Sequence, residues 1–69
     1  MKREDTRVRI QRAVAMVREY REKHGRWPDM ESPFIGTLDL ETEDIEVAVE
    51  TGALRVVSGS PNGARLEAP

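Results

Sequence analysis

The chain has 69 residues, a length that corresponds to one small domain near the lower limit at which a single hydrophobic core folds unaided. Apolar residues make up 38% and charged residues 35% of it, which argues against disorder but leaves a thin core. Cysteine is absent, so disulfides and thiolate metal sites are excluded, and no apolar run approaches the roughly 18 residues that span a bilayer. Residues 1–5 lack the apolar character of a signal peptide, so we expect a cytoplasmic protein that does not enter a membrane.

Charge is sorted along the chain into blocks of opposite sign. Residues 1–28 hold nine basic and four acidic side chains, whereas residues 29–50 hold eight acidic side chains and no basic one. When such a chain folds, the two blocks give it a large dipole that orients it toward charged partners. The charge pattern therefore favours a charged macromolecule as the partner.

Residues 6–24 carry the clearest helical periodicity. Asp5 or Thr6 suits the N-cap, Gly25 suits the C-terminal stop, and Asp5 and Arg9 are spaced for an ion pair along the helix. Six side chains recur at spacings of three and four residues and define one stripe: Ile10, Ala13, Val14, Val17, Tyr20 and His24. This pattern predicts a long helix with one face in the core.

Residues 25–36 are predicted to form an ordered connection. Pro33 and Gly36 leave this region with few helix signals. Its large side chains are too apolar to remain in water and are expected to fold back over the long helix: Trp27, Met30, Phe34 and Ile35.

Residues 42–51 fit two templates. Thr42 followed by acidic residues is a favourable helix start, and Gly52 supplies a helix stop. Against this, apolar and polar residues alternate through residues 38–49 as they do in a strand, and several are β-branched. We favour a helix over 42–51, because the signals at both ends agree with the helical spacing. The alternative is one helix packed on a meander, whose strands are residues 37–41, 45–50, 53–58 and 64–67.

The C-terminal region is predicted to be a β-hairpin. Residues 53–57 and 64–67 are expected to form its strands. Residues 58–63 are all Ser, Gly, Pro or Asn, which favour turns, and they end in Asn62-Gly63. The predicted fold of the single domain 1–69 is therefore α+β, with a long N-terminal helix and a short second helix packed on a small antiparallel sheet. The core is expected to contain Ile10, Val14, Val17, Tyr20, Trp27, Phe34, Leu38, Ile45, Val49, Leu54, Val56 and Leu66.

The order of these elements resembles that of a winged-helix domain. Residues 19–28 are similar to the end of the first helix in LexA-type repressors, where a Tyr, a His-Gly pair and a Pro also occur, here Tyr20, His24, Gly25 and Pro28. Residues 44–57 are similar to a final helix that runs into the wing. The resemblance implies a DNA-binding regulator of transcription whose last helix enters the major groove. The chain departs from this pattern in lacking signals for a helix between those two regions.

A second departure lies in the charge of the predicted helix 42–51. It displays several acidic side chains and no base, so phosphate groups would repel it. If nucleic acid binds, it must contact arginines of the long helix and of the hairpin, and arginine suits bidentate phosphate contacts. The candidates are Arg7, Arg9, Arg12, Arg18, Arg55 and Arg65. The alternative is that these arginines form a solvated helix face with intrahelical pairs.

The acidic segment supports a competing hypothesis, a protein-interaction module or inhibitor that docks a basic partner or a second copy in a homodimer. Its residues are Asp39, Glu41, Glu43, Asp44, Glu46 and Glu50. These acids do not form a calcium loop, because Asp44 stands where that loop requires glycine. Without a nucleophile motif, and with one histidine, the chain is not expected to be an enzyme or to bind a cofactor or metal. The sequence thus predicts a small non-enzymatic regulator.

Overall fold

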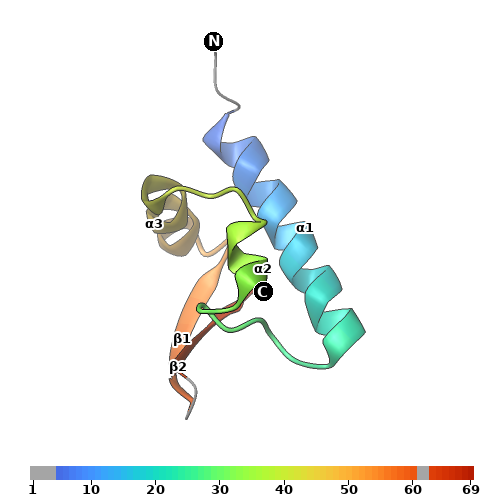
Figure 1. Cartoon of the computed structure of the whole chain (residues 1–69). Helices are drawn as coiled ribbons and strands as arrows, with labels where there is room; N and C mark the ends of the chain where they lie inside the picture. Colours follow the sequence, from blue (N-terminus) through green and yellow to red (C-terminus); the bar gives the residue numbers. More distant parts are fainter. Residues whose placement is uncertain (1–4, 61–62) are drawn as a thin grey trace.

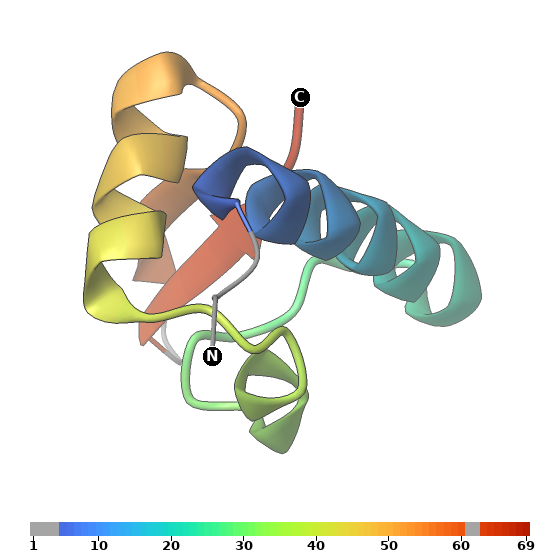
Figure 2. The same cartoon turned by 90° about the horizontal axis from the view of Figure 1, so that it is seen from above.

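Within residues 5–60 and 63–69, which the computed structural model describes, the chain forms three helices and one β-hairpin (Figure 1). The elements are α1 (Thr6–His24), α2 (Pro33–Gly36), α3 (Thr42–Thr51), β1 (Arg55–Ser60) and β2 (Gly63–Glu67). The predicted α+β class is confirmed. Figures 1 and 2 show α3 lying beside the N-terminal half of α1, with the hairpin extending away from both helices.

Helix α1 has the predicted bounds, and both of its ends are capped as expected. The carboxylate of Asp5 accepts a hydrogen bond from the backbone N–H of Arg7 at 2.7 Å, which satisfies one of the free donors of the first turn. At the other end, Gly25 has φ +71 and donates its N–H to the carbonyl of Arg21 at 2.9 Å. The predicted stripe faces inward through Ile10, Ala13 and Val17, which are buried.

Helix α2 was not expected from the sequence, and the prediction that residues 25–36 lack a helix is wrong for this one turn. Ser32 is its N-cap, and its Oγ accepts a hydrogen bond from the N–H of Phe34 at 3.2 Å. Pro33 follows at the first helical position, where a backbone N–H would make no hydrogen bond within the helix, so the lack of one in proline costs nothing. The Ser-Pro pair was thus the start signal, and the short helix ends at Gly36.

Residues 42–51 form the helix α3, so the helical alternative is confirmed and the meander is wrong. The N-cap is Glu41 rather than Thr42. Glu41 and Asp44 form a reciprocal capping box, in which the Asp44 carboxylate accepts the N–H of Glu41 at 3.0 Å. Gly52 ends the helix with φ +79.

The hairpin is antiparallel, with Arg55 opposite Glu67, Val56 opposite Leu66 and Val57 opposite Arg65. Its strands run closer to the tip than predicted, to Ser60 and from Gly63, and the register shifts between Val57 and Ser60. The predicted turn residue Asn62 lies outside the described residues.

The connection after α1 borders the free edge of β2. The carbonyl of Pro28 accepts the N–H of Leu66 at 2.9 Å, and Met30 donates its N–H to the carbonyl of Ala64 at 2.9 Å. An isolated bridge between Asp29 and Arg65 completes this pairing. Pro28 is buried, and proline is tolerated here because the pairing uses its carbonyl and requires no N–H from it. This backbone pairing holds the connection against β2, whereas the predicted fold-back over α1 is made by side chains, with the ring of Phe34 packed on that of Tyr20.

The core lies where α1 meets α3 and the start of the hairpin. Its buried members are Ile10, Ala13, Val17, Leu38, Ala48, Leu54, Leu66 and Ala68. Val14, Tyr20, Trp27, Phe34 and Ile45, also predicted for the core, are half-buried. The predictions for Val49 and Val56 are wrong, because these side chains are 45% and 41% exposed. Helix α3 turns Asp44 and Ala48 inward instead, and Val56 lies on β1, a strand that, within the described chain, has a neighbour in the sheet on one side only.

None of the helices among the described residues combines the length and the apolar character required to cross a membrane.

Candidate functional site

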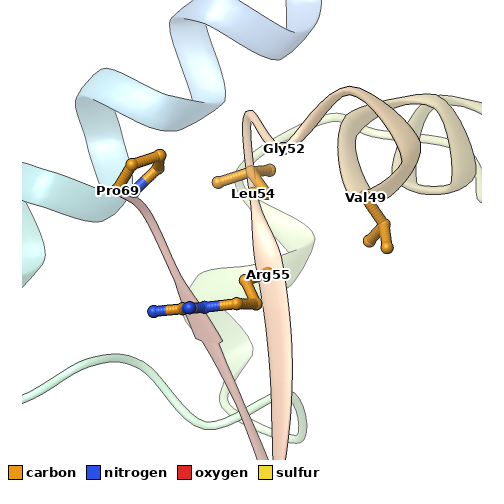
Figure 3. Close-up of a pocket in the computed structure, with 5 residues that line it drawn as sticks. All are labelled: Val49, Gly52, Leu54, Arg55 and Pro69. Atoms are coloured by element: carbon orange, nitrogen blue, oxygen red, sulfur yellow. The ribbon is translucent and has the colours of Figure 1, made fainter.

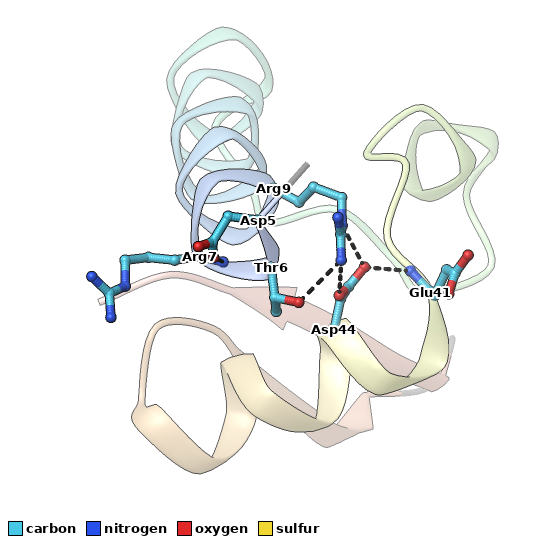
Figure 4. Close-up of polar contacts among 6 residues, drawn as sticks. All are labelled: Asp5, Thr6, Arg7, Arg9, Glu41 and Asp44. Carbon is cyan, nitrogen blue, oxygen red and sulfur yellow. Dashed lines mark hydrogen bonds and ion pairs between the residues drawn. The ribbon is translucent and has the colours of Figure 1, made fainter. Parts of the chain in front are cut away.

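A buried ion pair joins α1 to α3 (Figure 4). The Nε and Nη2 atoms of Arg9 donate to Oδ2 and Oδ1 of Asp44 at 3.0 and 2.8 Å, a bidentate arrangement. Thr6 Oγ1 accepts a further bond from Arg9 Nη2 at 3.0 Å. The two charged side chains are only 8% and 3% exposed. This pair therefore fixes how α3 docks on α1.

The buried pair takes one residue from each of the two surfaces predicted from the sequence. Arg9 was a candidate for nucleic acid and Asp44 for a basic partner, yet each satisfies the other inside the fold. Asp5, the expected partner of Arg9 along the helix, is engaged at the N-cap instead. Arg9 and Asp44 therefore belong to the interior of the fold and not to either predicted surface.

On the hairpin, Glu67 lies between the two candidate arginines of that element. Arg55 and Arg65 each place an Nη2 atom 3.4 Å from a carboxylate oxygen of Glu67. Glu67 is 13% exposed, whereas the side chains of Arg55 and Arg65 are 71% and 41% exposed. The two arginines are thus neighbours, and they share a counter-ion that the sequence analysis did not single out.

Three of the candidate arginines surround one set of adjoining depressions, which we call the arginine face: Arg7 and Arg18 of α1 and Arg55 of β1. The depressions have volumes of about 410, 260 and 240 Å³, and each adjoins the next through shared lining residues. Ala53 lines the first two and Pro69 the last two. Figure 3 shows the last, with Leu54 between Pro69 beside α1 and Val49 on α3, and Arg55 at its border.

The arginine face is cationic with an apolar floor. Asp5 is the only acidic residue that lines its depressions among the described residues, and its carboxylate is held at the N-cap of α1. Arg18 Nη2 donates to the backbone oxygen of Pro69 at 2.8 Å, which ties the segment after β2 to α1. The side chain of Arg7 points away from the Arg9–Asp44 pair in Figure 4. The floor is formed by Ile10, Val14, Ala53, Leu54 and Pro69.

Arg12 and Arg65 lie elsewhere. Arg12 is exposed on α1, about 140° around the helix from Arg7, and lines none of these depressions. Arg65 is on the hairpin beside Glu67, and its buried Nε has no hydrogen-bond partner among the described residues. The fold therefore brings together three of the six arginines predicted to contact nucleic acid.

The acidic candidates separate in a similar way. Glu43, Glu46 and Glu50 recur at spacings of three and four residues on the side of α3 away from Asp44 and Ala48, and all three are exposed. We call this the glutamate face. Asp39 and Glu41 are exposed on the connection to α3, where Asp39 has φ +57 and Glu41 caps the helix.

The C-terminal end of α1 carries an aromatic cluster. The ring of Tyr20 lies 4.2 Å from that of His24 and 4.7 Å from that of Phe34, measured between centroids. The guanidinium of Arg21 lies 5.6 Å from the ring centroid of Trp27. These contacts attach α2 and the connection to α1. Within the described part of the chain, no three or more His, Asp or Glu side chains gather into a group that could hold a metal ion.

No family model, characterised protein or solved structure matches this chain.

Proposed function

We propose that this protein is a small, non-enzymatic regulator that binds nucleic acid through the arginine face. The observation that carries the proposal is the meeting of Arg7, Arg18 and Arg55 around adjoining depressions, although they come from α1 and from a strand far along the chain. The guanidinium group of arginine forms bidentate hydrogen bonds with phosphate oxygens. Three arginines on one surface can therefore contact successive phosphates of a nucleic-acid backbone.

The glutamates of α3 do not oppose this mode of binding. Helix α3 and its C-cap Gly52 border the arginine face through uncharged residues, which on the helix are Val47, Val49 and Thr51. Glu43 and Glu46 lie on the outer side of that helix, so a backbone seated between Arg7, Arg18 and Arg55 does not have to cross them. Any nucleic acid would therefore be held by α1 and the hairpin, not by insertion of α3 into a groove.

The order of the elements supports the same proposal. The resemblance to winged-helix domains lacked a helix between the first and the last one, and α2 now stands at that place. The helix before the hairpin is acidic on its outer side, so phosphate groups would repel it. Phosphate contacts are therefore assigned to α1 and the hairpin. Because phosphates carry no sequence information, this binding does not depend on base sequence.

The expected binding is weak and sensitive to salt. Three phosphate contacts give a slope of about −2.7 for the logarithm of the binding constant against that of the salt concentration. Affinity for a short DNA duplex then falls by roughly 40-fold between about 50 and about 200 mM salt. Fluorescence anisotropy of a labelled duplex measures this directly.

Single substitutions test whether the arginine face makes the contacts. Arg7→Gln and Arg55→Gln should each lower the slope by about 0.9, because each removes one phosphate contact. Arg26→Gln is the matched control, since Arg26 is exposed but lines none of the three depressions. The absence of binding at the lowest salt, or equal losses for Arg26→Gln and Arg55→Gln, would reject the proposal.

A further inference from the structure

We infer that the glutamate face of one copy docks on the arginine face of a second copy, giving a two-fold symmetric dimer. This inference does not depend on nucleic-acid binding. It rests on surfaces of opposite charge that lie side by side on the same chain, each of which combines charged side chains with apolar ones.

The glutamate face is unpartnered within the described chain. Glu43, Glu46 and Glu50 make no ion pair with any described residue, and α3 carries no basic residue. Two valines flank these glutamates on either side of the helix, Val47 at 39% and Val49 at 45% exposure. A helix with such a surface fits a partner that is cationic at its rim and apolar at its centre.

The arginine face has that composition. Its rim holds Arg7, Arg18 and Arg55, and its floor is apolar. The depressions lie along the N-terminal part of α1 and the start of β1, where they leave room for apolar side chains of a partner.

The position of the two faces selects a two-fold arrangement. They adjoin at α3, because Val47 and Val49 flank the glutamates and also line two of the depressions. In a two-fold dimer each copy then presents its glutamates to the partner's arginines, and the same contact is made twice. The exposed valines would be covered in the same interface.

Reciprocal charge reversal tests this dimer. The first variant carries Glu46→Lys and Glu50→Lys, two positions on α3 beyond its first turn, where lysine is compatible with the helix dipole. The second carries Arg7→Glu and Arg18→Glu, both on exposed positions of α1. Self-association is measured without nucleic acid and at low salt, by light scattering after size exclusion over a range of concentrations.

The wild-type protein should approach twice the monomer mass as its concentration rises. Each reversed variant should associate at least about tenfold more weakly, because like charges then face each other. An equimolar mixture of the two variants should recover the dimer, since each interface again joins opposite charges. Circular dichroism of each variant verifies that it is folded.

Control variants carry the same change in charge near the C-terminal end of α1, as Glu19→Lys with Glu22→Lys on the helix and as Lys23→Glu with Arg26→Glu, where Arg26 lies just after it. They should dimerise like the wild type. A wild-type protein that stays monomeric at low salt, folded reversed variants that dimerise unchanged, or a mixture that fails to associate would each overturn the inference. A monomer at every concentration would leave the glutamate face available to a different basic partner.

Discussion

Removing the charge of Asp44 should destabilise the fold more than any surface charge change. Asp44→Asn keeps the shape of the side chain and an oxygen that can accept the N–H of Glu41, but it removes the carboxylate charge that the buried guanidinium of Arg9 contacts through two hydrogen bonds. Breaking a buried pair from one side costs about 3–5 kcal/mol. A chain of this length has a total stability of roughly 3–10 kcal/mol, so the variant should be close to unfolding.

Urea denaturation followed by circular dichroism gives the free energy of unfolding. With a slope of about 1 kcal/mol per molar urea, the midpoint of Asp44→Asn should fall by about 3–5 M or the variant should be unfolded in buffer. Glu19→Gln is the control, because it breaks the pair with Lys23 at 3.2 Å whose side chains are 67% and 66% exposed. That change should cost at most about 0.5 kcal/mol.

A double variant distinguishes the loss of the pair from the loss of a side chain. Arg9→Met with Asp44→Asn removes both charges, and its stability should recover by at least about 2 kcal/mol relative to Asp44→Asn. If Asp44→Asn costs no more than Glu19→Gln, or if the double variant is less stable than Asp44→Asn, the buried pair does not hold α3 on α1 as described here.

Three further substitutions test other parts of the account. Gly52→Ala, at φ +79 with open space around the added carbon, should cost about 1 kcal/mol in a thermal melt, and an unchanged midpoint would contradict the left-handed end of α3. Leu54→Ala should cost about 2–5 kcal/mol, whereas Val49→Ala should cost less than about 1 kcal/mol, and equal losses would place Val49 in the core after all. Glu67→Gln removes the counter-ion shared by Arg55 and Arg65, so it should tighten duplex binding by about threefold at low salt, and weaker binding would argue against a role for Arg55.

The elements that the sequence predicted are those with local signals. Helix α1 combines a repeating apolar stripe with Asp5 and Gly25 at its ends, and all of these act within a few residues of one another. Helix α3 was the better of two alternatives because Gly52 and the acids of its first turn agreed with its spacing. The one-turn helix α2 also had a local signal, Ser32 before Pro33, but its length is too short for a repeating pattern.

What the sequence did not predict depends on contacts between distant segments. Arg9 and Asp44 are 35 residues apart, and no spacing rule links them. Their pairing turns α3 so that Asp44 and Ala48 face α1, which explains why the sequence pattern misplaced Val49 in the core. For the same reason, the sequence suggested six arginines, but only the folded chain gathers Arg7, Arg18 and Arg55 on one face.

The central claim is that the cationic and anionic surfaces are separate and that the cationic one contacts nucleic acid. Titrating a short duplex into isotopically labelled protein at low salt, with backbone amides and arginine Nε groups observed by NMR, tests it most directly. At a protein concentration at which the chain is monomeric, the account predicts saturable shifts at Arg7, Arg18, Arg55 and Ala53, with Glu43 and Glu46 unaffected. Shifts centred on Glu43 and Glu46, or no shifts at all, would contradict it.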